Sequence, residues 1–276
     1  MLGTESPGDE ELVARVAAGD RAAATALVER HASAVRRLAQ TLVGAHGPAD
    51  DVTPEALARA LASCERYEPS LGKVRTWLFS IARHVAFEQL RHAKRVVPEP
   101  TDDSPIFELA VGAGFGAITP EDALAGAEQR EALVQALAAL PAPDREILVL
   151  RDIEGISGEE AAKLLGLDLP ATKSRLHRAR LRLLANLRAI SEGAMPEDRN
   201  VAGVSCSEVL HMLGDYVDGE LGPTDVARVE NHVRGCTVCE RFGGRFTATV
   251  RDLKTHLGAA PSVSPELANA LRKLLG

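Results

Sequence analysis

The sequence predicts an all-α fold, and three observations support this prediction. Aromatic residues make up only 3% of the 276 residues, Ala and Leu are abundant, and β-branched runs are rare, which favours helices over strands. An apolar share of 45% is too high for an intrinsically disordered chain. No apolar stretch reaches the roughly 18 residues of a membrane span, and the acidic N-terminus does not look like a signal peptide. We therefore expect a cytoplasmic protein without a membrane segment.

The first block, residues 1–95, is expected to contain three helices. Asp20 suits the N-cap of the first helix. After it, residues of one helical face recur every three or four positions: Leu27, His31, Val35, Leu38 and Leu42. We expect His31 to be a structural residue of this face rather than a ligand. A second helix covers roughly residues 49–66, and a third carries Trp77 to Leu90 and ends in a basic run.

Two stretches without a helical period divide the rest of the chain. Residues 96–120 and 191–204 are rich in Pro and Gly and are interpreted as linkers. They enclose a second block, residues 121–190. Its helices are expected at residues 121–140, 143–151, 158–165 and 170–189. A third block, residues 205–257, holds three of the four cysteines, and the tail, residues 258–276, is expected to include one short amphipathic helix.

The second block contains the pattern of a helix-turn-helix. Ala162 is small where a second helix must cross closely, and Gly166 can adopt the left-handed conformation of a tight turn. Asp168 suits the start of the second helix. The inward side of this helix carries Leu176, Ala179 and Leu183, and its opposite face carries Arg175, Arg178 and Arg182.

The second helix of this pattern is basic although the net charge of the chain is −7. No Asp or Glu occurs from Lys173 to Arg188. A basic helix in this position has the size and charge for the major groove of DNA, where Arg and Lys bond guanine edges or phosphates. The alternative is a helical hairpin whose Arg-rich face is only solvated.

Residues 140–180 closely resemble region 4 of the extracytoplasmic-function (ECF) sigma factors. The most specific part is Lys-Ser-Arg-Leu-His-Arg-Ala-Arg at residues 173–180. The resemblance implies that this block reads the −35 promoter element and contacts the flap of the polymerase β subunit. It also implies a set of DNA-binding residues: Lys173, Ser174, Arg175, His177 and Arg178.

The first block resembles region 2 of the same family through Asp50-Asp51, Glu55, Arg59, Tyr67, Trp77-Leu78 and Ile81-Ala82-Arg83. The resemblance implies that the clamp helices of the polymerase β′ subunit are bound by Asp50, Asp51, Glu55 and Arg59. It implies that the −10 element is melted and held by Arg75, Trp77, Arg83, Arg91, Lys94 and Arg95. From its spacing alone, Trp77 is more simply a core residue than a stacking platform.

One position departs from the region 2 pattern. The family usually has Gln where this chain has Pro54, inside the docking helix. Proline lacks a backbone donor and strains the preceding turn. Alternatively, Thr53 caps a helix that restarts at Pro54. In either case we expect an altered docking surface for polymerase.

The third block carries a metal-ligand pattern formed by Cys206, His232, Cys236 and Cys239. The H-x3-C-x2-C spacing brings His232, Cys236 and Cys239 together, and Cys206 completes three sulfur ligands and one nitrogen ligand. This closed set is typical of structural zinc, and thiolate ligands exclude magnesium and calcium. The alternative is four reduced side chains without a metal. Cys64, in the first block, is expected to be a small buried apolar residue.

The third block also resembles the zinc-containing anti-sigma domain, which is usually a separate protein and is fused here to the sigma-like part. The shared residues include the string Asp218-Gly219-Glu220-Leu221. The sequence as a whole therefore predicts an ECF sigma factor that binds core RNA polymerase and promoter DNA and is restrained in cis by a zinc domain.

No nucleophile–base set, phosphate loop or open metal site indicates an enzyme. Two alternatives remain from the sequence: a DNA-binding regulator that no longer docks on polymerase, and a zinc or redox sensor module. No feature of the sequence identifies a separate regulator.

Overall fold

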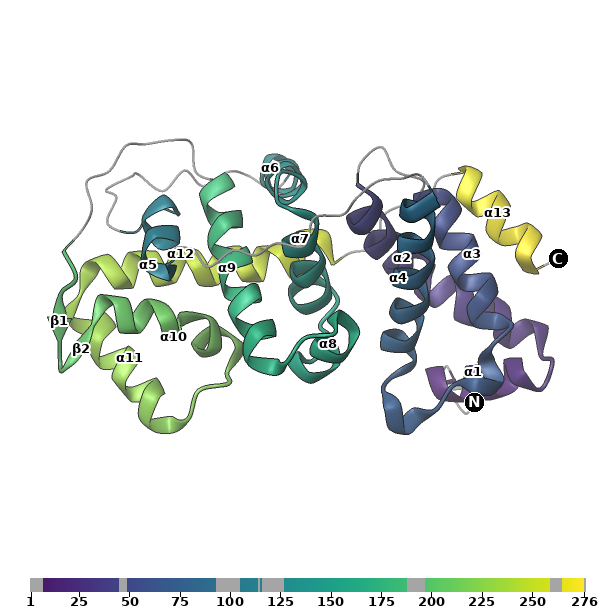
Figure 1. The fold of residues 1–276 in the computed structure, drawn as a ribbon, viewed down its shortest axis with the longest axis horizontal. Coiled ribbons are helices and arrows are strands. Elements are labelled where there is room, and N and C mark those ends of the chain that lie inside the picture. The colour runs from purple at the N-terminus through teal and green to yellow at the C-terminus, as the bar shows by residue number, and fades with distance from the viewer. Residues whose placement is uncertain are drawn as a thin grey trace, which may run out of the picture. The chain divides into compact units, whose positions relative to one another are not determined.

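The computed structural model describes residues 7–44, 49–92, 105–113, 115, 127–187, 197–258 and 265–275. These residues form helices α1 to α13 and one two-stranded hairpin, which confirms the all-α prediction (Figure 1). They group into two compact units. The first unit contains α1 to α4, α8 and α13, and the second contains the remaining elements. Lys94, Arg95 and residues 116–126 and 191–196, which include parts of both expected linkers, lie outside the described residues.

The first unit is built around four helices: α1 (Asp9–Ala17), α2 (Arg21–Val43), α3 (Ala49–Leu61) and α4 (Val74–His92). The Asp20 carboxylate caps α2 as expected, because its Oδ1 accepts hydrogen bonds from the backbone N–H groups of Ala22 at 2.9 Å and Ala23 at 3.1 Å. The helices α2, α3 and α4 pack against one another and bury the largest apolar side chains of this unit: Leu27, Leu38, Leu57, Leu78 and Phe79.

The helix α3 continues through Pro54 and does not restart there. It begins at Ala49, and the buried Thr53 hydroxyl donates to the Ala49 carbonyl at 2.7 Å instead of capping a new helix. The alternative of a restart at Thr53 is therefore wrong. Pro54 has no N–H for the carbonyl of Asp50, four residues earlier, so the proline weakens the first turns of α3.

Two further helices belong to the first unit. The amphipathic tail helix α13 (Pro265–Leu275) is present as predicted, and it packs on α3 and α2 with Leu267 and Leu271 buried. The helix α8 (Gly158–Leu165) contributes Glu160, whose Oε1 accepts a hydrogen bond from the Thr76 hydroxyl at 3.0 Å.

The second unit includes the remaining helices of the second block: α6 (Ala127–Ala138), α7 (Ala142–Leu148), its π-helical continuation Val149–Ile153, and α9 (Leu169–Leu187). Between α8 and α9 the chain turns at Gly166, which has a φ of +69°. Asp168 caps α9 as predicted, since its Oδ1 accepts from the Ala171 N–H at 2.7 Å. The chain therefore follows the helix-turn-helix pattern of the sequence.

The second unit also contains the segment that we call the zinc block, residues 200–257. It consists of β1 (Asn200–Val201), β2 (Val204–Ser205), α10 (Cys206–Asp218), α11 (Pro223–Gly235), α12 (Thr237–Asp252) and the π-helical turn Leu253–Leu257. The sequence missed the antiparallel hairpin, in which Asn200 pairs with Ser205. Its two-residue turn has positive φ at both Ala202 and Gly203, which matches the right-handed twist of the strands.

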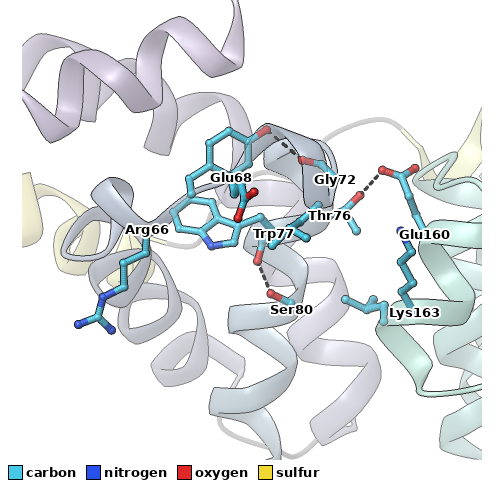
Figure 2. Close-up of a pocket in the computed structure, with 11 residues that line it drawn as sticks. Arg66, Glu68, Gly72, Thr76, Trp77, Ser80, Glu160 and Lys163 are labelled. Atoms are coloured by element: carbon cyan, nitrogen blue, oxygen red, sulfur yellow. Dashed lines mark hydrogen bonds between the residues drawn. The ribbon is translucent and has the colours of Figure 1, made fainter.

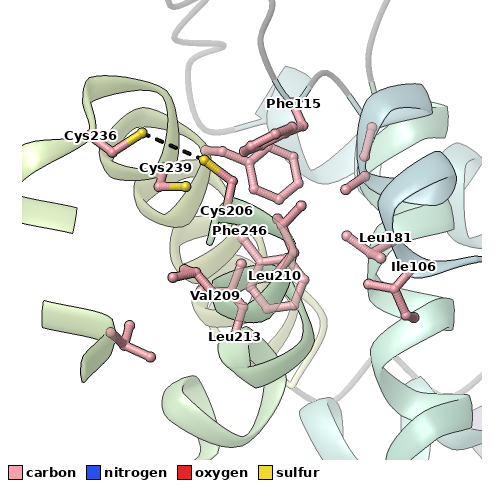
Figure 3. Close-up of a cluster of buried hydrophobic side chains, with 14 of the residues drawn as sticks. Ile106, Phe115, Leu181, Cys206, Val209, Leu210, Leu213, Cys236, Cys239 and Phe246 are labelled. Carbon is pink, nitrogen blue, oxygen red and sulfur yellow. Dashed lines mark hydrogen bonds between the residues drawn. The ribbon is translucent and has the colours of Figure 1, made fainter. Parts of the chain in front are cut away.

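A helix also lies within residues 96–120, where the sequence predicted no regular structure. This helix, α5 (Ile106–Gly112), buries Ile106 and Ala110, and Phe115 follows it into the same apolar cluster. Figure 3 shows Ile106, Phe115 and Leu181 of α9 together with side chains of α10 and α12. The segment between Pro105 and the following glycines is too short to show a helical period of apolar residues in the sequence. Burial against two other elements stabilises it, so the expectation of a bare linker is wrong here.

Candidate metal centre and nucleic-acid interface

The four predicted metal ligands meet at one point of the zinc block. Cys206 begins α10, His232 lies in the last turn of α11, Cys236 separates α11 from α12, and Cys239 lies in the first turn of α12. All four side chains are buried, and their ligand atoms lie within 4.8 Å of one another. Figure 3 shows the three sulfur atoms converging.

The distances among these ligand atoms suit a tetrahedral zinc ion. Cys206 Sγ lies 3.8 Å from Cys236 Sγ and 3.5 Å from His232 Nε2. Tetrahedral zinc, with bonds of about 2.3 Å to sulfur and about 2.0 Å to nitrogen, separates its ligands by about 3.8 Å and about 3.5 Å. His232 Nδ1 lies 2.9 Å from the Val204 carbonyl and donates to it, which leaves the lone pair of Nε2 for a metal.

The three thiols of this cluster have perturbed pKa values. Burial alone would raise the pKa of Cys236, but hydrogen bonds from the backbone of Cys239 and Val238 outweigh it and lower this pKa. Burial, together with the neighbouring Cys206 and Cys236, raises the pKa of the Cys239 thiol. Burial likewise raises the pKa of Cys206. Three buried thiolates repel one another without a metal, whereas a divalent cation stabilises their deprotonated forms.

The basic helix α9 faces acidic side chains of the zinc block. Lys173, His177 and Arg180 share one face, which packs on α10. Lys173 Nζ lies 2.7 Å from Glu220 Oε2 and 3.4 Å from Asp215 Oδ2. This side of α9 is therefore covered by the zinc block, whereas the alternative of a solvated face concerns Arg175, Arg178 and Arg182.

His177 is the buried ring of α9 that packs against the zinc block. Its side chain is only 7% exposed, and its ring centroid lies 5.7 Å from that of Phe246 on α12. A Cβ atom at Gly214 of α10 would come within 2.9 Å of His177 Nδ1. Any side chain at position 214 would therefore require His177 or one of the two helices to shift.

Arg180 links α9 to two acidic residues that come from different parts of the second unit. Its guanidinium is 3% exposed and forms paired hydrogen bonds with Asp152, at 2.6 and 3.0 Å, and with Asp218, at 2.6 and 3.1 Å. Asp152 follows α7 in the chain, and Asp218 ends α10. Arg180 is therefore a buried structural connector between the helix-turn-helix block and the zinc block.

The remaining arginines of α9 have different surroundings. Arg175 and Arg178 are half-exposed, and Arg178 donates to the Ser174 hydroxyl. Arg182, expected on the same open face, instead pairs with the buried Asp144 at 2.5 Å. The predicted DNA-binding residues of α9 thus occupy two sides: Lys173 and His177 contact the zinc block, and Ser174, Arg175 and Arg178 do not belong to that contact.

Acidification is expected to weaken the packing of α9 through His177. Burial, with Arg180, His211 and Arg178 nearby, lowers the pKa of His177 to about 4, compared with about 6.5 in an unfolded chain. Below pH 6.5, His177 takes up a proton in the unfolded chain but stays neutral in the native state until the pH approaches 4. Stability is therefore lost as the pH falls from about 6.5 to 4. The loss amounts to about 3 kcal/mol. Unfolding measured at several pH values should show this component in the wild type, and an unchanged pH dependence in His177→Gln would contradict it.

In the first unit, Trp77 lines a surface pocket of about 250 Å³ (Figure 2). Its ring centroid lies 5.4 Å from that of Tyr67, whose hydroxyl donates to the Gly72 carbonyl at 3.0 Å. Trp77 is half-buried, and the core positions of this turn belong to Leu78 and Phe79. The interpretation of Trp77 as a core residue is therefore wrong, and two aromatic rings remain accessible at one pocket.

The predicted cations of α4 are held beside aromatic rings. The Arg75 guanidinium lies 5.7 Å from the ring centroid of Phe79, and that of Arg83 lies 4.6 Å from the ring centroid of Phe87. Arg91 is exposed at the end of α4. This arrangement presents positive charge along α4 with the orientation of two side chains fixed by cation–π contacts.

The predicted polymerase-binding residues lie on the outer side of α3. Asp50 pairs with Arg36 at 2.8 Å, and Arg59 pairs with both Glu55 and Glu88 at 2.7 Å. Asp51, Glu55 and Arg59 are exposed. These surface pairs contribute little to stability and leave the charged groups available to a partner.

Sequence reasoning missed four residues that oppose or accompany α9: Arg151, Asp215, Asp218 and Glu220. Asp218 and Glu220 belong to the Asp-Gly-Glu string, whose resemblance to the anti-sigma domain says nothing of a contact with α9. The signal that could have identified them is charge complementarity between an acid-free helix and an acidic helix end.

None of the described helices is long and apolar enough to cross a membrane.

Comparison with known protein families gives three matches along the chain. Residues 27–96 match the family model of sigma-70 region 2, residues 130–183 match that of sigma-70 region 4, and residues 206–239 match a model described as "Putative zinc-finger". The last segment contains all four candidate metal ligands.

Individual relatives are similar to about two thirds of this chain. The ECF RNA polymerase sigma factor SigE of Mycolicibacterium smegmatis is 34% identical over 64% of this chain and 68% of its own length. The ECF RNA polymerase sigma factor SigM of Mycobacterium tuberculosis is 32% identical over 69% of this chain and 90% of its own length. Among solved structures, CnrH in complex with the cytosolic domain of CnrY aligns at 27% identity, over 65% of this chain and 96% of that chain, with a TM-score of 0.44.

Proposed function

Because this chain belongs to the family of ECF RNA polymerase sigma factors, we propose that it binds core polymerase in the cytoplasm through α3 and reads promoters through α4 and α9. We further propose that the zinc block restrains promoter reading in cis. The activity is the non-enzymatic delivery of polymerase to specific promoters. The zinc block carries the regulation, and it does so with a bound zinc ion.

Each of the two units binds one of the two promoter elements. In the first unit, Arg75, Trp77, Arg83 and Arg91 hold the opened −10 element, because stacking rings and cations suit unpaired bases and phosphates. The rings of Tyr67 and Trp77 at one pocket support this role. In the second unit, Ser174, Arg175 and Arg178 meet base edges or phosphates of the −35 element, together with Lys173 and His177 once these are uncovered.

The polymerase contacts follow the same division. The clamp helices of the β′ subunit are bound by Asp50, Asp51, Glu55 and Arg59, and the block with α7 and α9 contacts the flap of β. The exposure of Asp51, Glu55 and Arg59 supports the first contact. Although α13 packs on α3, it leaves these three side chains exposed, so the restraint acts on promoter reading.

The observation that carries the proposal is the burial of His177 and the pairing of Lys173 by the zinc block. A DNA duplex and α10 cannot occupy the same side of α9. The protein is therefore inactive in promoter reading while the zinc block is in place, and release of the block starts transcription.

A single methyl group tests this restraint. In Gly214→Ala, the added Cβ meets His177 at 2.9 Å, which forces α10 away from α9 and costs about 1–3 kcal/mol. Run-off transcription with core polymerase should increase relative to the wild type. The matched control is Gly244→Ala on α12, where the added Cβ has no atom within 4 Å. We prefer this variant to removal of the zinc block, because removal would uncover Leu181 and Phe115.

The same assay separates the alternatives. Reduced transcription in Gly214→Ala, with core binding retained, would make the zinc block an activator instead of a restraint. Failure of the wild type and of Gly214→Ala to co-purify with core polymerase would favour a DNA-binding regulator without polymerase docking. Transcription that stays at the level of the Gly244→Ala control would remove the cis restraint from the proposal.

A further inference from the structure

We propose that Arg151 and Lys173 form a binding site for a DNA backbone phosphate, and that the Glu220 carboxylate occupies this site while the zinc block is in place. The inference rests on the proposed function, in which α9 meets promoter DNA. It adds a DNA-contacting residue, Arg151, that lies outside the helix-turn-helix, and it assigns a specific role to the acidic end of α10.

The geometry consists of two cations that converge on one carboxylate. Glu220 Oε1 accepts from Arg151 Nη2 at 3.1 Å, and Glu220 Oε2 lies 2.7 Å from Lys173 Nζ. The two cations come from different elements, the π-helical turn after α7 and the first turns of α9. A phosphodiester also presents two anionic oxygens, so it can take both contacts of the carboxylate.

The Arg151 side of the site is held in place by a backbone contact in the turn before α8. Arg151 Nη1 donates to the Ile156 carbonyl at 2.7 Å, and the Arg151 side chain is only 14% exposed. This bond keeps the other end of the guanidinium directed toward Glu220. Arg151 is therefore preorganised for an anion, and Lys173 on α9 reaches the same point.

The acidic side is set by a glycine-dependent helix end. Gly219 ends α10 with a φ of +70°, in the left-handed region that favours glycine, and the Glu220 N–H donates to the Asp215 carbonyl at 2.8 Å. This turn directs Glu220 back along α10, on the same side as Asp215 and Asp218. The Asp-Gly-Glu string thus places two carboxylates, those of Asp218 and Glu220, beside that of Asp215 opposite α9.

The charges of the site favour an anion. Burial alone would raise the pKa of Glu220, but Lys173 and Arg151 outweigh it and lower this pKa, while Glu220 raises the pKa of Lys173. Among the described residues, every carboxylate within 4 Å of these two cations belongs to the zinc block: Asp215, Asp218 and Glu220. When the block leaves, the positive charge of the pair is exposed to the phosphate backbone.

Phosphate and Glu220 therefore compete for the same two cations. A phosphate contact is independent of DNA sequence and releases a counterion, so each one adds about 0.9 to the steepness of the salt dependence of binding. Any duplex can serve as the probe, and the promoter sequence is not needed.

The experiment measures the fluorescence anisotropy of a short, labelled, mixed-sequence DNA duplex titrated with the full chain at several salt concentrations. Glu220→Gln should bind the duplex about two- to fivefold more tightly than the wild type, because two partly exposed ion pairs are lost. Glu230→Gln on α11 is the matched control, since it removes the same charge from a pair with Arg234 outside this site. The control should bind like the wild type.

A second pair of variants tests the cations. In the Glu220→Gln background, Arg151→Gln should make the salt dependence less steep by about 0.9, whereas Arg228→Gln, a surface arginine of α11, should leave it unchanged. Equal affinities of Glu220→Gln and Glu230→Gln, or a salt dependence that Arg151→Gln does not alter, would overturn the phosphate site.

The Gly214→Ala variant distinguishes this failure from that of the proposed function. If Gly214→Ala raises duplex affinity and Glu220→Gln does not, the cis restraint stands and the phosphate site is wrong. If neither variant raises duplex affinity, the restraint and the phosphate site both fail.

Discussion

Replacing Cys236 with serine is expected to abolish metal binding and to unfold the zinc block while the first unit stays folded. Cys236 is 2% exposed and lies 3.8 Å from Cys206 Sγ, so its loss breaks a closed set of four ligands. Structural zinc in small domains contributes on the order of 10–16 kcal/mol, which exceeds the stability of such a block without metal. The α5 helix and Phe115 should lose their packing at the same time, because they share the apolar cluster with Cys206 and Cys236.

Metal analysis and two optical signals measure this result. The wild type should contain about one zinc ion per chain, and Cys236→Ser should contain none. Far-ultraviolet circular dichroism should report the lost helices, while the fluorescence of the single tryptophan, Trp77, reports the first unit. Cys64→Ser is the control, because Cys64 is a buried cysteine of the first unit whose Sγ donates to the Ala60 carbonyl at 3.4 Å. Full zinc content in Cys236→Ser would show that the ligand set is wrong.

Replacing Arg180 with alanine is expected to destabilise the second unit by about 3–5 kcal/mol. The substitution leaves the Asp152 side chain, which is 2% exposed, and Asp218 without the guanidinium that binds both. A buried carboxylate that loses its cation retains the full cost of desolvation. The contact between α9 and α10 should loosen as well, because Arg180 is its buried ionic link.

Chemical denaturation distinguishes a loss of stability in the second unit from a loss of stability in the whole protein. The circular dichroism transition of Arg180→Ala should shift to lower denaturant, and the Trp77 fluorescence transition should stay in place. Arg228→Ala, whose side chain is 41% exposed in surface pairs with Glu208 and Asp225, should change stability by less than about 1 kcal/mol. Adding Asp152→Asn to Arg180→Ala should recover part of the loss. A stability equal to that of Arg228→Ala would mean that the buried pair is not the link between the blocks.

The distribution of charge along the chain explains why α9 pairs with acidic residues from other segments. The protein carries a net charge of −7, yet α9 contains no acidic residue from Lys173 onward. Lys173 and Arg180 instead receive acidic partners from Asp215, Asp218 and Glu220, which are about 40 residues later in the chain. In the proposed function, this pairing neutralises the surface of α9 that would face a DNA backbone, and release of the zinc block would expose it.

Local patterns in the sequence were sufficient for the helical class, the helix-turn-helix and the clustering of the four candidate metal ligands. The Asp20 and Asp168 caps lie where helix-start residues predicted them, because a cap depends on backbone groups within three positions. The ligands Cys206, His232, Cys236 and Cys239 could be named because zinc requires a fixed number and type of donors, and three of the four are close in sequence.

Only the tertiary structure decided which surfaces these elements cover. The helix α5 has no readable period, and its burial depends on Phe242 and Leu181, which come from distant segments. The zinc block covers the face of α9 on which Lys173 pairs with Glu220 and Arg180 pairs with Asp218. These pairs form because α10 packs closely on α9 at Gly214. Hydrophobic period and ligand spacing are properties of neighbouring residues. The pairing of charges across the core depends on how whole helices fit together, and no local pattern specifies it.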